Sequence, residues 1–165
     1  MKRLIIGIGL SVAVATAVAG QGPKYGVTVN AEKNVDFAKF KTYSWTKGQP
    51  SPVKEIDTTI TQAVDRELGA LGMTKATSGT GDALIAYYSL TRTDVDTKAK
   101  PDTTGARPQY SVGTLMVALL DPGSRKRLLR LRIDTPIETE GTKLNDSINQ
   151  AVAALFAEYP TRKPK

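Results

Sequence analysis

The amino-acid sequence predicts an α+β fold in which two helices pack on one face of a mostly antiparallel sheet. Two segments carry apolar residues at helical spacing along a single side, which is typical of helices that bury one face. Five other segments have the length and composition of strands, and a short turn joins the last two as an antiparallel hairpin. The predicted order is strand, strand, helix, three strands, helix.

The first half of the chain supplies two strands and a helix. Residues 25–29 alternate apolar and polar side chains, and residues 42–45 combine aromatic and small ones, so both are predicted as strands. The helix is expected to start at Pro52 with Ser51 as its cap, because proline suits the first helical position. Gly72 is expected to end it, since glycine accepts a left-handed backbone. Its apolar side consists of Ile56, Ile60, Ala63, Val64, Leu68 and Leu71.

The second half supplies the remaining strands and the second helix. Three segments are predicted as strands, at residues 83–91, 112–120 and 127–133. Residues 121–124 form an Asp-Pro-Gly-Ser turn between the last two. Residues 94–109 are expected to be a long polar loop, a feature that is often functional in a compact domain. The last helix is predicted over residues 142–159, because Pro160 stops it.

Residues 1–19 have the pattern of a cleavable export signal. Lys2 and Arg3 precede an apolar run, and the Ala-Val-Ala sequence at residues 17–19 suits a signal peptidase. The alternative is a retained membrane anchor, but a spanning helix needs roughly 20 apolar residues and this run is shorter. Cleavage leaves residues 20–165 as a single α+β domain with no membrane span. The expected location is the periplasm or the extracellular space.

Composition narrows the chemistry that the chain can perform. It has 23 basic and 16 acidic residues, and loss of Lys2 and Arg3 leaves a net charge of +5. This excess favours an anionic envelope partner, either a lipid headgroup or a polysaccharide, whereas an exported protein rarely meets nucleic acid. Histidine and cysteine are both absent, which removes thiol nucleophiles, imidazole bases and zinc sites built on those residues. No catalytic residue, cofactor or metal is therefore predicted.

Residues 35–45 read Val-Asp-Phe-Ala-Lys-Phe-Lys-Thr-Tyr-Ser-Trp. This stretch resembles the opening motif V-D-F-S-x-F-K-T-Y-x-W of a bacterial envelope family, the domain of unknown function 4136. Four later segments resemble the rest of the family pattern in the same order: residues 60–72, 82–88, 110–121 and 148–160. The resemblance implies an envelope location and a fold of two helices on one sheet, and it transfers no catalytic residue.

The chain departs from the family pattern at two places. Many members carry a lipid-attachment cysteine, which this chain lacks, and the return strand has Leu-Arg-Leu-Arg at 129–132 where tryptophan and glycine are common. An unacylated variant is therefore expected. The four aromatic residues of the opening motif are expected to fill the core rather than to contact a ligand: Phe37, Phe40, Tyr43 and Trp45.

The densest basic run offers the candidate ligand site. Arg130 and Arg132 share one face of a predicted strand, and Lys126 precedes it, so the three are predicted to bind an anionic headgroup or polymer. The alternative is a solvated face whose charges discourage edge aggregation.

An acidic loop offers the other candidate. Asp94, Asp96 and Asp102 lie in the loop of residues 94–102 and could gather around calcium or serve a hydrolase, the alternative being a solvated loop. The glycine-rich turn at residues 78–82 is rejected as a phosphate site, because it precedes a strand. The sequence thus favours a non-enzymatic binding or structural module of the envelope, with a small carboxylate-dependent hydrolase as the alternative.

Overall fold

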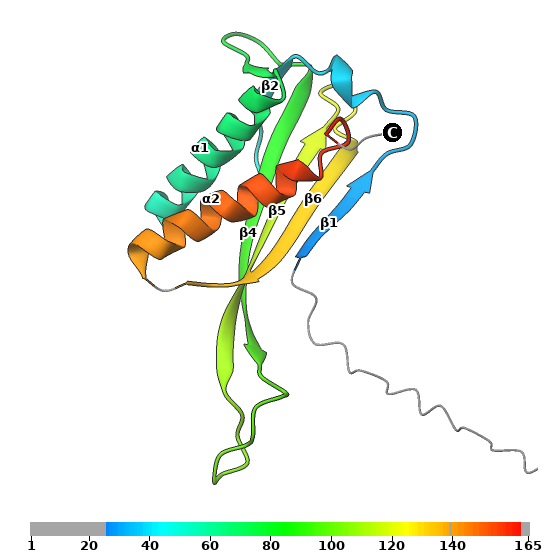
Figure 1. Ribbon diagram of the computed structural model, residues 1–165. Coiled ribbons are helices and arrows are strands. Elements are labelled where there is room, and N and C mark those ends of the chain that lie inside the picture. The colour runs from blue at the N-terminus through cyan, green and yellow to red at the C-terminus, as the bar shows by residue number, and fades with distance from the viewer. Residues whose placement is uncertain (1–25, 139, 163–165) are drawn as a thin grey trace, which may run out of the picture.

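The computed structural model describes residues 26–138 and 140–162, which form two layers: a six-stranded sheet and two helices on one of its faces (Figure 1). The α+β prediction is confirmed. The elements are β1 (Gly26–Ala31), a 3-10 turn η1 (Phe37–Lys39), β2 (Thr42–Trp45), α1 (Lys54–Ala70), β3 (Thr74–Lys75), β4 (Ala83–Val95), β5 (Gln109–Leu120), β6 (Arg127–Pro136) and α2 (Gly141–Ala157). Residues 1–19, the predicted export signal, lie outside the described residues. Within the described part, no helix is long and apolar enough to cross a membrane.

The strands follow the order β1-β6-β5-β4-β2-β3 across the sheet. The four strands from β1 to β4 pair antiparallel, as predicted, but β2 runs parallel to both β4 and β3. The sheet is therefore mixed. The reason is the connection: α1 crosses from the end of β2 back to the start of the next strands, and such a crossover places strands parallel.

Helix α1 ends as predicted and begins later than predicted. Gly72 has φ +80°, and its N–H donates to Gly69 while Met73 donates to Leu68, which is the hydrogen-bond pattern of a glycine-terminated helix. At the other end, Val53 precedes the first helical residue and has no side-chain cap. Ser51 does not occupy the cap position: its hydroxyl accepts from the Val53 N–H at 3.3 Å, before the helix begins, and its own N–H donates to the Tyr87 hydroxyl at 3.2 Å.

The long loop predicted at residues 94–109 is present at residues 96–108, but its two ends, residues 94–95 and residue 109, belong to β4 and β5. β4 and β5 pair without a break from Leu84 opposite Leu120 to Val95 opposite Gln109. β6 leaves this hairpin at Val112, so residues 93–111 project from the sheet as a two-stranded arm (Figure 1). Both faces of the arm are exposed to solvent, so its strands need no alternation of apolar and polar residues. The ends of β4 and β5 therefore cannot be recognised from the sequence pattern.

The core lies between the sheet and the two helices. Phe37 and Tyr43 are buried in it, and Phe40 and Trp45 pack half-buried against it, which agrees with their expected core role. Phe37 also meets the Tyr159 ring edge-on, with ring centres 5.9 Å apart. The opening motif thus joins the strand layer to the end of α2.

Candidate binding surface

The sheet face that carries no helix contains the predicted basic residues on β6. Leu129 and Leu131 enter the core, so the alternate residues Arg130 and Arg132 point to the opposite, helix-free face. Arg130 lies between Ala118 of β5 and Asn30 of β1. Arg132 occupies the next row, between Met116 and Thr28. The two arginines therefore form a short stripe along β6, as the alternation predicts.

Asp134 neutralises one of these arginines. Its carboxylate accepts hydrogen bonds from Arg132 at 3.0 Å, from Arg92 of β4 at 2.8 Å and from the Thr114 hydroxyl of β5. Burial alone would raise the pKa of Asp134, but the bonds from Arg132, Thr114 and Arg92 outweigh it and lower the pKa to about 2. Arg92 also pairs with Asp94, so two arginines and two aspartates balance in one network at the base of the arm.

Lys126 is also paired. Its ammonium group lies 3.1 Å from the Glu32 carboxylate, just beyond the end of β1. Both side chains are more than 40% exposed, so this ion pair contributes little to stability. It nevertheless reduces the net charge that Lys126 offers to an anion.

Of the three predicted residues, Lys126, Arg130 and Arg132, Arg130 is the one whose charge is not paired with a described carboxylate. Among the described residues it makes no ion pair, and its buried Nε lacks a hydrogen-bond partner. Ala118 on one side and Asn30 on the other bring no opposite charge. The structure thus places all three predicted residues around one strand, but it leaves only Arg130 with an unbalanced cation.

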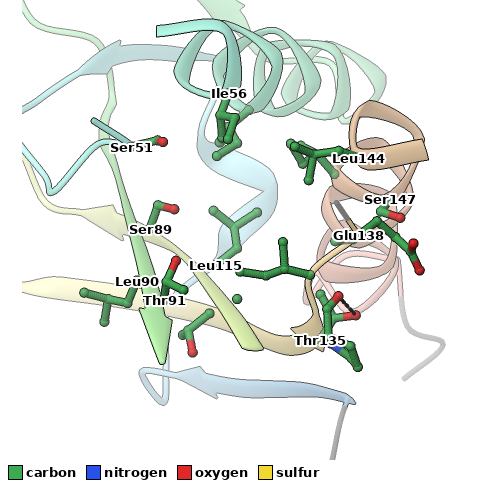
Figure 2. Close-up of a pocket in the computed structure, with 17 residues that line it drawn as sticks. Ser51, Ile56, Ser89, Leu90, Thr91, Leu115, Thr135, Glu138, Leu144 and Ser147 are labelled. Carbon is green, nitrogen blue, oxygen red and sulfur yellow. Dashed lines mark hydrogen bonds between the residues drawn. The ribbon is translucent and has the colours of Figure 1, made fainter. Parts of the chain in front are cut away.

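A small pocket opens between both helices and the base of the arm (Figure 2). Ile56 of α1, Leu144 of α2 and Leu115 of β5 project toward its centre, and serine and threonine hydroxyls stand around them. Its volume is about 130 Å³. Pockets for drug-sized ligands span roughly 300–1,000 Å³, so this one suits a single small apolar group. Sequence reasoning missed it, because its walls come from five elements far apart in the chain.

The acidic residues of the arm do not form a common site. Asp94 pairs with Arg92, Asp96 accepts from the backbone of Lys98, and Asp102 accepts from the backbone N–H of residues 104 and 106. Asp96 and Asp102 thus stabilise their own turns, and Asp94 belongs to the network around Arg92. In residues 26–138 and 140–162, no three potential metal-ligating side chains come together. The arrangement offers neither the calcium cluster nor the paired carboxylates that the hydrolase alternative needs.

The carboxylates of α1 are used to attach the helix to the sheet. Asp65 accepts from the Tyr43 hydroxyl at 2.7 Å and from the Trp45 indole N–H at 2.8 Å. Burial, with a smaller effect of Asp65, raises the pKa of Tyr43 well above its usual range. About two turns earlier in the helix, Asp57 accepts from the Tyr87 hydroxyl, and mainly burial raises the pKa of Tyr87 to about 12. Both tyrosine hydroxyls therefore stay protonated at physiological pH and can always donate their hydrogen bonds to the helix.

The glycine-rich turn at residues 78–82 also serves the fold. Gly81 lies so close to β2 that a Cβ there would stand 2.6 Å from the Tyr43 Cα. Asp82 accepts from the backbone N–H groups of Lys41 and Thr42 at 2.9 Å, and these bonds lower its pKa. The turn connects β4 to β2 by close packing and hydrogen bonds. These contacts explain why the turn contains glycine and aspartate, and no bound phosphate is needed to explain it.

The sequence profile of one family, described as the domain of unknown function DUF4136, matches residues 27–161. The chain belongs to the DUF4136 family. The match spans the sheet, both helices and the aromatic opening motif, so the resemblance of that motif is confirmed. None of the curated proteins matches this DUF4136 chain.

Solved structures share the fold of this DUF4136 domain at low sequence identity. A PDZ domain protein from Parabacteroides distasonis superposes with a TM-score of 0.62 and 15% identity over 85% of the chain. The chain spans only 36% of that protein's length. PelC from Paraburkholderia phytofirmans, solved as a dodecamer, gives a TM-score of 0.54 and 8% identity, with 86% of this chain and 100% of PelC covered. At these identities the similarity concerns the fold alone.

Proposed function

We propose that this DUF4136 protein is an exported accessory module of the cell envelope that binds or assembles with a partner and performs no chemistry. The chain lacks histidine and cysteine, and the carboxylates that face other polar groups are engaged in structural bonds. Residues 1–19 are proposed to direct export and to be removed. PelC, which shares the fold, was solved as a dodecamer, and this supports assembly as part of the role.

The helix-free sheet face is the proposed binding surface for an anionic group. The observation that carries this proposal is Arg130, whose charge no described carboxylate balances. A phosphate or carboxylate would supply the partner that its guanidinium lacks, in the planar geometry that arginine favours. Arg132 is expected to contribute less, because Asp134 already holds it. An anionic lipid headgroup and an acidic polysaccharide both present this chemistry.

Cell fractionation with an intact mass of the purified protein tests the export part. A mass equal to that of residues 20–165, found in the periplasm or medium, is the expected result. A full-length mass in the membrane fraction would contradict it and favour a retained anchor.

Binding to phosphatidylglycerol vesicles and to an acidic polysaccharide, each over a series of salt concentrations, tests the surface. Arg130→Ala is expected to weaken binding several-fold, and Arg132→Ala to weaken it less. Lys98→Ala on the exposed arm is the matched control, because it removes the same charge away from the face. Vesicle binding alone would point to lipid, and polymer binding alone to polysaccharide. If Arg130→Ala binds both probes as well as Lys98→Ala does, the proposed surface is wrong.

A further inference from the structure

In the part of the chain that the structure describes, no strand pairs with the outer edge of β1. β1 pairs only with β6, and it is the outermost strand on its side of the sheet (Figure 1). An exposed edge presents unpaired backbone groups to other chains, and proteins commonly protect it with charges, proline or a bulge. The sequence of β1 is Gly-Val-Thr-Val-Asn-Ala, which contains none of the protecting residues, and its pairing with β6 is regular throughout.

The register shows which backbone groups face outward. The N–H of Glu32 donates to the Leu128 carbonyl at 2.8 Å, so this opposed pair is hydrogen-bonded. Hydrogen-bonded and non-bonded pairs alternate along an antiparallel ladder. Thr28 and Asn30 therefore bond to β6, whereas the N–H and C=O groups of Val27, Val29 and Ala31 point away from the sheet.

We propose that this edge pairs with the same edge of a second copy of the chain, antiparallel and centred on Val29. In that register Val29 faces its own symmetry mate, and Val27 faces Ala31 of the second copy. All three outward residues then form hydrogen-bonded pairs, which gives six backbone hydrogen bonds across a two-fold axis. The two sheets become one continuous sheet.

The side chains of β1 fit this pairing on both faces. Val27 and Val29 are only half-buried against the core, and the second copy would cover them with the matching valine and alanine. On the helix-free face, exposed Thr28 would stand opposite Asn30, so that polar side chains meet. β1 carries no charge, and hence no like charges oppose each other within the paired strands.

The nearest cations do not prevent the pairing. Arg130 would share a row with Arg132 of the second copy, three strand spacings away, which is roughly 14 Å. The Debye length at physiological salt is about 8 Å, so this repulsion is largely screened. The inference depends on the sheet edge alone and stands whether or not Arg130 binds an anion.

Cysteine trapping tests the pairing and its register together, because the chain has no native cysteine. Thr28→Cys and Asn30→Cys are prepared as separate proteins, and both sites are exposed. The proposed register opposes residue 28 and residue 30 as a non-bonded pair with Cα atoms about 4.5 Å apart, within disulfide reach. Residue 28 and its own symmetry mate would be diagonal neighbours at about 7–8 Å, beyond easy reach.

Mild oxidation of the mixed proteins is expected to give several-fold more disulfide dimer than either protein oxidised alone. Equal yields from the mixture and from Thr28→Cys alone would overturn the proposal. Sedimentation velocity over a dilution series supplies an independent measurement. The wild-type sedimentation coefficient should rise with concentration, and Ala31→Pro should abolish the rise, because it removes an outward N–H and leaves the β6 ladder intact. Ala31→Ser, which keeps the N–H, is the control. A wild type that stays monomeric at every concentration would also refute the pairing.

Discussion

Replacing Asp65 with alanine should detach α1 from β2 at their main polar contact. Asp65 accepts two hydrogen bonds, from the Tyr43 hydroxyl at 2.7 Å and the Trp45 indole at 2.8 Å, and pairs with Lys75 at 3.6 Å. A hydrogen bond to a charged group contributes about 1.5–3 kcal/mol, and partial exposure of Asp65 favours the lower end. The exposed Lys75 pair adds at most about 1 kcal/mol. We expect a loss of about 3 kcal/mol in the free energy of unfolding.

Urea unfolding measures this loss with two probes. Trp45 is the only tryptophan, so its fluorescence reports on the contact itself, and far-UV circular dichroism reports on the whole fold. For a domain of this size, about 3 kcal/mol corresponds to a fall of roughly 6–12 °C in Tm. Asp146→Ala on the exposed face of α2 is the matched control, and it should change stability by less than about 0.5 kcal/mol.

A double-mutant cycle with Tyr43→Phe separates the hydrogen bond from other effects of the substitution. If the bond is as described, Asp65→Ala and Tyr43→Phe together should cost less than the sum of the two alone, by about 1–2 kcal/mol. A loss below about 1 kcal/mol for Asp65→Ala, with additive effects in the cycle, would refute the role assigned to Asp65.

Three further substitutions follow from the packing and the charges. Gly81→Ala places a Cβ against the Tyr43 backbone and should destabilise the protein by more than about 2 kcal/mol. Gly69→Ala adds a Cβ with no atom within contact distance and should stabilise the helix by about 0.5–1 kcal/mol. Thermal melts of the two variants test both values. The lowered pKa of Asp134 contributes stability that is complete above about pH 4 and lost as pH falls toward 2, about 1–2 kcal/mol in all, and an unchanged acid profile in Asp134→Asn would contradict it. Tyr159→Phe removes a buried hydroxyl without a described partner and should leave Tm equal or higher; a clear fall would reveal a hidden partner.

Local pattern in the sequence was enough to predict most of the fold. The apolar stripes of both helices, the alternation in β6 and the chemistry of Gly72 each depend on neighbours within a few residues, and all three appear in the structure. The same alternation placed Arg130 and Arg132 on one face. The family resemblance also rested on local motifs, chiefly the aromatic opening at residues 35–45, and the profile match over residues 27–161 confirms it.

Only the tertiary structure decided which charges are available and which edges are open. Arg130 and Arg132 are equivalent in sequence, but Arg132, Arg92 and Thr114 converge on Asp134 from three strands. Arg130 makes no ion pair among the described residues. Strand order likewise determines the parallel direction of β2, the projecting arm and the position of β1 at the edge of the described sheet. Strand order arises from contacts between residues far apart in the chain, and these contacts cannot be predicted from the local periodicity of the sequence.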